Sequence, residues 1–239
     1  MTEPPLLVVS DVVKAYRGLR PLRLRALTVQ AGEVVSIAGL DEAAAEVFVS
    51  LVTGAGLPDE GRVALFGAPT DAIPDSATWL QTLEQLGLVS TRAVLVDPLT
   101  ARQNIAMPFT LDVDPIDPAY KPQVDALARE VGLEDAVLDV PVGAAGPVVQ
   151  ARARLARALA LGPRLLLAEH PTAAVDRAEA AAFGADLSRI ARARGTAVVA
   201  VTADPAFAGA LGGRALTLKP ATGELAVGGL LGRIAGLWK

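Results

Sequence analysis

Only a few side chains in this sequence are suited to catalysis or ligand binding. Glu169 and His170 are adjacent and follow a short apolar run, so a carboxylate and an imidazole stand side by side there. An imidazole has an ordinary pKa near neutrality, so His170, beside Glu169, could act as a general base. The alternative is that His170 is a polar residue that ends a strand.

Gly39 is followed by the carboxylates of Asp41, Glu42 and Glu46. Asp41 and Glu42 can hold a metal ion, but acidic residues in the first turn of a helix are usually caps, and the sequence favours capping. Tyr16, one of two tyrosines, can stack on a nucleotide base or can simply pack against the core. No metal site is predicted.

The composition excludes several classes of chemistry. The 239 residues include no cysteine and one histidine, which rules out disulfides and thiolate chemistry and argues against histidine-rich metal sites or triads. A net charge of −4 without lysine or arginine blocks argues against nucleic-acid binding. Because no basic region precedes the first apolar run, the N-terminus does not resemble a secretory signal, and a cytoplasmic location is expected.

The elements that must position these residues follow from hydrophobic periodicity. Uniformly apolar runs alternate with helical patterns, which predicts an α/β fold with a parallel sheet covered on both faces. The expected strands are 6–9, 22–29, 33–37, 62–66, 87–90, 164–168, 196–202 and 215–218, and the expected helices are 41–53, 75–86, 122–131, 151–160 and 176–194.

The middle of the chain lacks a convincing strand from about residue 91 to 160 and has a proline-rich connector at 108–122. This length predicts a helical subdomain, at about 92–160, inserted into one domain that spans 1–239. Arg152, Arg154 and Arg157 form a basic stripe there, usually a solvated face. The apolar tail at 228–239 could dock on a partner, a membrane surface or its own core.

The order of segments is more informative than any single residue. After the 33–37 strand come Gly39, a helix that ends at Thr53-Gly54, and the turn LPDEG (57–61) before the next strand. Later come DPLTARQNIA (97–106), RALALGPRLLLAEHPTAAVD (157–176) and GTAVVAVTAD (195–204). This order resembles the ATP-binding cassette subunit of ABC transporters over nearly the whole chain. The segment at 99–108 resembles the lipoprotein-release and lipid-trafficking branch.

The resemblance implies a P-loop-NTPase-like fold with a mixed sheet core, an N-terminal antiparallel β-subdomain and the helical insertion. It also implies a phosphate-binding loop, Walker A, at 39–46. In the family, a lysine of this loop reaches the outer phosphates and a Ser or Thr hydroxyl binds Mg²⁺. Here Gly39 is kept, but Ala45 stands at the lysine position and Glu46 at the hydroxyl position.

The other family positions depart in the same way. Glu169 matches the Mg²⁺-binding Walker B carboxylate and His170 the catalytic base, while Thr91 matches the Q-loop glutamine and Ala203 the switch histidine. The signature loop matches 145–149, where Ser is absent and Pro147 removes a backbone donor. Tyr16, at the adenine-stacking position, and Asp176, after the Pro-Thr turn, are kept.

The resemblance together with these departures predicts a pseudo-ATPase that keeps a structural or regulatory role on a membrane permease. Its expected partners are a transmembrane permease subunit and another cassette, as a homodimer or heterodimer. Its expected location is peripheral, on the cytoplasmic face of the inner membrane, without a bound cofactor. The alternative is a divergent but active subunit that binds ATP and Mg²⁺ through Tyr16 and Gly39 and uses Glu169 and His170.

Overall fold

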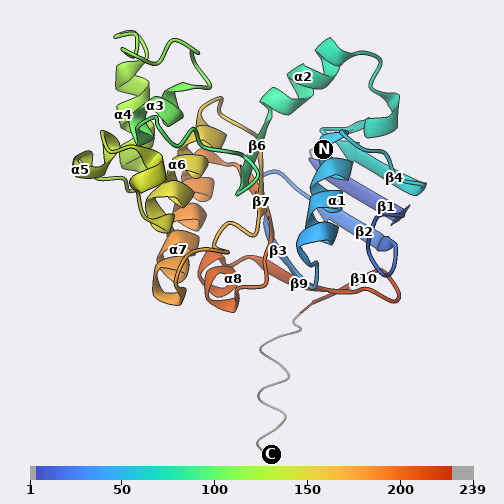
Figure 1. Ribbon diagram of the computed structural model, residues 1–239. Coiled ribbons are helices and arrows are strands. Elements are labelled where there is room, and N and C mark those ends of the chain that lie inside the picture. The colour runs from blue at the N-terminus through green and yellow to red at the C-terminus, as the bar shows by residue number, and fades with distance from the viewer. Residues whose placement is uncertain (1–3, 228–239) are drawn as a thin grey trace, which may run out of the picture.

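The computed structural model describes residues 4–227. Two sheets form the scaffold (Figure 1). The smaller is antiparallel, in the order β2-β1-β4-β5. Its strands are β1 (Leu7–Lys14), β2 (Leu22–Val29), β4 (Glu60–Leu65) and β5 (Ala68–Pro69). Apolar residues alternate along β2, as expected for a strand with one buried face.

The larger sheet is mixed and has the order β10-β9-β3-β8-β7-β6. Five of its strands are parallel, and β10 pairs antiparallel with β9 at one edge. Strands β7 and β8 are buried along their whole length, because helices or the other sheet cover both faces. The strands are β3 (Val34–Ala38), β6 (Leu86–Ser90), β7 (Leu165–Glu169), β8 (Ala197–Val201), β9 (Arg214–Lys219) and β10 (Glu224–Val227).

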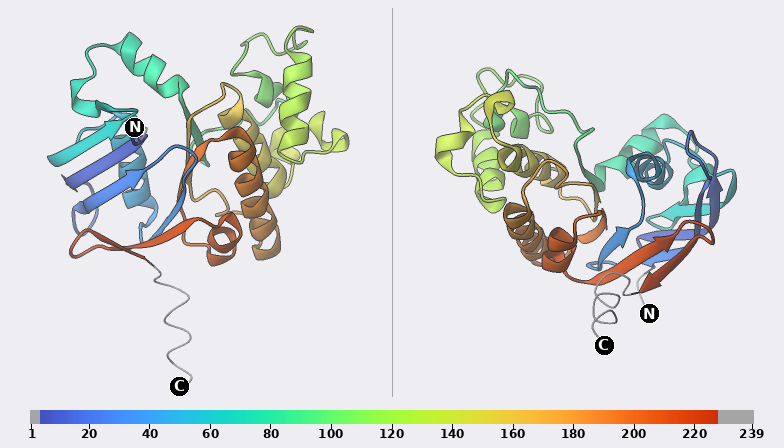
Figure 2. Two further views of the ribbon diagram at one scale, coloured as in Figure 1. Left: turned by 180° about the vertical axis from the view of Figure 1, so that it is seen from behind. Right: turned by 60° about the horizontal axis from the view of Figure 1, so that its bottom comes forward.

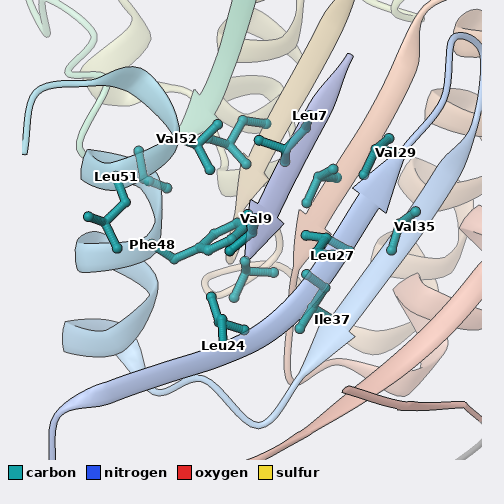
Figure 3. Packing of buried hydrophobic residues seen from close by; sticks show 14 of the residues in the cluster. Leu7, Val9, Leu24, Leu27, Val29, Val35, Ile37, Phe48, Leu51 and Val52 are labelled. Atoms are coloured by element: carbon teal, nitrogen blue, oxygen red, sulfur yellow. The ribbon is translucent and has the colours of Figure 1, made fainter. Parts of the chain in front are cut away.

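The smaller sheet and α1 (Glu42–Thr53) cover one face of the larger sheet. Phe48 of α1, 1% exposed, packs among apolar side chains from both sheets (Figure 3). The helix α2 (Ser76–Glu84) follows β5 and a short 3-10 turn, and the Trp79 indole donates to the carbonyl of Thr53 at the end of α1 (2.8 Å).

The other face is covered by helices, as both views in Figure 2 show. Gly87 of β6 allows close packing there, because a Cβ at this position would lie 2.5 Å from the carbonyl oxygen of Ala158. The helices are α3 (Ala101–Ala106), α4 (Lys121–Glu130), α5 (Asp135–Leu138), α6 (Pro147–Leu159), α7 (Arg177–Arg194) and α8 (Pro205–Leu211).

The predicted α/β class, antiparallel N-terminal sheet and mixed core sheet are confirmed. No strand lies between β6 and β7, where the sequence predicted only helices. The helix predicted from 151 begins earlier, at Pro147, because proline is well suited to the first position of a helix. The sequence did not predict β5, β10, α3, α5 or α8, and the apolar tail at 228–239 lies outside the described residues. Between residues 4 and 227, no helix is long and apolar enough to span a membrane.

Candidate functional site

The carboxyl ends of the parallel strands bring most of the predicted site residues to one edge of the larger sheet. In the ladder, Ser90 at the end of β6 is paired with Glu169 at the end of β7, and Glu169 is paired with Val201 of β8. Gly39 follows β3, which pairs with β8. The common strand direction therefore places Gly39, Ser90 and Glu169 along the same edge.

The turn after β3 leads directly into α1. Gly39 has φ of +90°, and a Cβ there would lie 2.8 Å from the carbonyl oxygen of Leu218, so glycine is required on both grounds. Asp41 is the N-cap, and its Oδ1 accepts the backbone N–H of Ala44 (2.8 Å). Ala45 is completely buried, whereas Glu46 is exposed. Asp41 therefore acts as a helix cap, one of the two roles, cap or metal ligand, that its sequence position allowed.

A pocket of about 400 Å³ lies between this turn and the loop after β1. Its lining includes Tyr16, Arg20, Gly39, Asp41 and Leu218. Tyr16 is half-buried, and its burial, together with the negative charge of Asp41, raises the pKa of its hydroxyl above the ordinary value. Tyr16 and Gly39, the two residues predicted to contact a nucleotide, therefore share one pocket.

Glu169 is 4% exposed and its carboxylate is held by neighbours on β6 and just beyond it. The Ser90 hydroxyl donates to Oε2 (2.7 Å), and Arg92 donates to the same oxygen from Nε (3.1 Å) and Nη2 (2.8 Å). The backbone N–H of Arg92 in turn donates to the Ser90 hydroxyl (3.1 Å). A buried carboxylate needs such partners, because burial of an unpaired charge is strongly unfavourable.

Arg92 also reaches the other side of the site. Its Nη1 lies 3.0 Å from Oε1 of Glu46, on α1, so one guanidinium bridges two carboxylates. The two ion pairs of Arg92 differ in their exposure to solvent, since the Glu46 side chain is 58% exposed and that of Glu169 is 5% exposed. The Glu169 end is thus the better shielded from solvent and salt.

His170 directly follows Glu169 at the end of β7. It has φ of +40°, an unusual conformation for a residue other than glycine, and its backbone N–H donates to the carbonyl of Val201 (2.8 Å). Its Nε2 is buried and has no hydrogen-bond partner. This nitrogen therefore makes no hydrogen bond to Glu169, and the role of His170 as a general base stays a prediction.

The remaining predicted positions lie around this edge or beyond it. Thr91 and Ala203 are exposed. Asp176 caps α7 by accepting the N–H groups of Ala178 and Glu179, both at 3.0 Å, and the hydrogen bond from Glu179 is the main cause of the lowered pKa of its carboxyl. The segment matched to the signature loop forms the start of α6, with Gly146 as N-cap and no side-chain cap.

The arginine stripe on α6 is not a fully solvated face. Arg152 pairs with Asp186 (2.8 Å), and Nη1 of Arg157 donates to the carbonyl of Val94 (2.7 Å). Burial lowers the pKa of both Arg154 and Arg157, and Nε of Arg154 is buried without a hydrogen-bond partner. Both residues line a groove of about 180 Å³ between β6 and α6.

Comparisons with known proteins agree with this architecture. The chain is 31% identical over 208 residues to the lipoprotein-releasing system ATP-binding protein LolD of Alcanivorax borkumensis, an alignment that covers 85% of this chain and 90% of that protein. It is 30% identical over 202 residues to LolD 1 of Rhodopseudomonas palustris, with coverages of 82% and 89%. The chain belongs to the ATP-binding cassette proteins of ABC transporters. No protein-family model matches this cassette.

A solved structure supports the same fold. The dimeric post-hydrolysis state of an ATP-binding cassette bound to ADP and Pi superimposes on this cassette with a TM-score of 0.74. The superposition covers 94% of this chain and 98% of that one, at 24% sequence identity. The predicted resemblance to ABC cassettes is therefore confirmed at the level of family and fold.

Sequence reasoning missed Ser90 and Arg92. It matched Thr91 to the metal-linking glutamine, but the contacts to Glu169 come from the residues on either side of Thr91. A signal was present, because Arg92 lies two residues after the predicted strand at 87–90 and Glu169 lies directly after the predicted strand at 164–168. Adjacent parallel strands would bring these two charges together at one edge.

The Tyr16 hydroxyl offers a test of the pocket geometry. We expect Asp41→Asn to lower the pKa of Tyr16, because the substitution removes a negative charge that raises it, while asparagine still caps α1. The measurement is a spectrophotometric tyrosinate titration in a Tyr120→Phe background, which leaves Tyr16 as the only tyrosine. Asp71→Asn, at an exposed carboxylate that does not line the pocket, is the control and should leave the titration unchanged.

Proposed function

We propose that this cassette is a pseudo-ATPase: an ABC-transporter subunit that keeps the cassette fold and a structural or regulatory role on a membrane permease but does not hydrolyse ATP. In this proposal residues 1–239 form one nucleotide-binding-type domain, with the helical insertion at about 92–160. The transmembrane permease is one partner, and a second cassette subunit, identical or different, is the other. The subunit lies on the cytoplasmic face of the inner membrane.

One observation carries the proposal: the carboxylate of Asp41 caps the start of α1. Helix N-termini attract phosphate because their N–H groups are free, and here the Asp41 carboxylate already accepts one of them, from Ala44. Ala45, at the family's lysine position, is buried and uncharged. The triphosphate of ATP would meet the carboxylates of Asp41, Glu42 and Glu46 without a lysine in this loop to offset them.

The second half of a cassette site supports the same proposal. By the resemblance, a dimer builds each ATP site from the phosphate loop of one subunit and the signature loop of the other. In this chain the matching segment begins α6 with Gly146 and Pro147, and it offers no serine hydroxyl. Both halves that this chain could contribute are therefore altered, so an intact partner would not restore either site.

A second candidate function is a divergent but active ATP-binding subunit. The observation that favours it is the pocket beside Gly39, which is lined by Tyr16 and by Arg20. In that case a base would stack on Tyr16 and the phosphates would have to displace the Asp41 cap. The two candidates differ in a single measurable property, the affinity for nucleotide.

Nucleotide binding is tested by thermal unfolding and isothermal titration calorimetry of the full chain with Mg-ATP and Mg-ADP at up to millimolar concentrations. A nucleotide at about 100 times its Kd would stabilise the protein by about 2.7 kcal/mol and raise Tm by roughly 5–10 °C. We expect no shift and no heat of binding. A clear shift that Tyr16→Ala removes would contradict the pseudo-ATPase and support the active alternative.

The structural role is tested in the transporter complex. We expect the permease to lose its associated cassette subunit when this chain is deleted, as measured by co-purification. A full-chain Ala45→Ser variant, which adds one hydroxyl at the buried loop position and restores no lysine, serves as a matched control and should assemble normally. Unchanged co-purification of the permease with the other cassette without this chain would contradict a structural role.

A further inference from the structure

Arg92 presents all three of its guanidinium nitrogens to two carboxylates from different parts of the fold. Nε and Nη2 donate to Oε2 of Glu169 at the end of β7 (3.1 and 2.8 Å), and Nη1 lies 3.0 Å from Oε1 of Glu46 on α1. The Ser90 hydroxyl donates to the same oxygen of Glu169 (2.7 Å). Two carboxylates therefore converge on one cation, and that cation belongs to the protein.

The oxygen atoms around the guanidinium are those that a hard divalent cation prefers. By the resemblance, Glu46 and Glu169 stand at the two positions through which a cassette holds Mg²⁺. While Arg92 is in place, however, Mg²⁺ does not fit. The ion would have to compete with a guanidinium for the same oxygens, and it would lie beside a fixed positive charge. Within residues 4–227 no group of three or more acidic, histidine or cysteine side chains could hold a metal instead.

We infer that Arg92 is a built-in cation that takes the place of the metal at this site and holds the site in one conformation without a ligand. The inference rests on the proposed function and deepens it, because it names the side chain that fills the metal position. The bridge ties α1 to the end of β7 and to the segment that follows β6. By the resemblance, that last segment is the one through which metal binding reaches the permease.

The geometry accounts for an arginine rather than a lysine at this position. The planar guanidinium presents Nε and Nη2 to Glu169 and still directs Nη1 to Glu46, whereas a lysine is a point charge on a flexible chain. The N–H of Arg92 also donates to the Ser90 hydroxyl, which fixes the backbone from which the side chain extends. The cation is therefore positioned by the fold and is not supplied by solvent.

The test removes the internal cation and offers an external one in the absence of nucleotide. Thermal unfolding of the full chain is measured with increasing Mn²⁺ or Mg²⁺ for the wild type, Arg92→Ala and Arg92→Gln. Arg62→Ala is the matched control, an exposed arginine on β4 whose side chain forms no ion pair among the described residues. Arg92→Gln keeps a hydrogen-bonding side chain, so it provides a folded variant should Arg92→Ala fail to fold.

We expect both Arg92 variants to unfold at a lower temperature than the wild type without metal and to recover on addition of Mn²⁺. At ten times the Kd, the ion should raise Tm by roughly 3–6 °C. The wild type and Arg62→Ala should show no such rise. Addition of Glu46→Gln to the Arg92→Gln variant should weaken the Mn²⁺ response, because it removes one of the two carboxylates.

Two results would overturn the inference. One is stabilisation of the wild type by Mn²⁺ to the same extent as the Arg92 variants, and the other is the absence of a metal response in a folded Arg92 variant. Neither metal response depends on nucleotide. Failure of this inference about Arg92 is therefore distinguishable from failure of the pseudo-ATPase proposal. That proposal fails instead when the wild type binds ATP.

Discussion

A carboxylate buried at the end of a central strand must have a cation beside it, and this requirement organises the edge of the larger sheet. Glu169 is almost completely buried between β6 and β8, where leaving its charge unpaired would be strongly unfavourable. Arg92 supplies the positive charge and Ser90 a hydrogen bond. Because the same guanidinium also contacts Glu46, the pairing extends from the sheet to α1 and fixes the turn beyond β6.

At the start of α1, too, a side chain of the protein itself provides the interaction, here a hydrogen bond to a free backbone N–H group. Asp41 accepts the N–H of Ala44, and the buried Ala45 leaves an uncharged position within the first turn. The cassette architecture is thus maintained by the parallel sheet, by the packing of Phe48 between two sheets and by internal charge pairs. An ABC-type scaffold with these replacements can dock on a permease and pair with a second cassette, as we propose, without a nucleotide cycle of its own.

Much of the fold could be predicted from the sequence, because its signals are local. Uniformly apolar strands such as β7 and β8 indicate a parallel sheet with two covered faces, and Asp41 marks the start of α1. The four-residue β10 could not be predicted, since it is defined by its pairing with β9. The residues of the loop at 39–46 could be placed, but the role of Arg92 depends on the parallel pairing of β6 with β7. That pairing brings together residues that are 77 positions apart in the chain.

We infer that side chains of this chain occupy the positions where a cassette would hold nucleotide and metal. A crystal structure tests this most directly. The crystals are grown with Mn²⁺ and a non-hydrolysable ATP analogue, and the anomalous signal of manganese locates the ion. We expect the guanidinium of Arg92 to lie between Glu46 and Glu169, the carboxylate of Asp41 to accept the N–H of Ala44, and no manganese peak to lie there. A manganese peak bound by Glu46 or Glu169, with Arg92 turned away and phosphates at the start of α1, would contradict it.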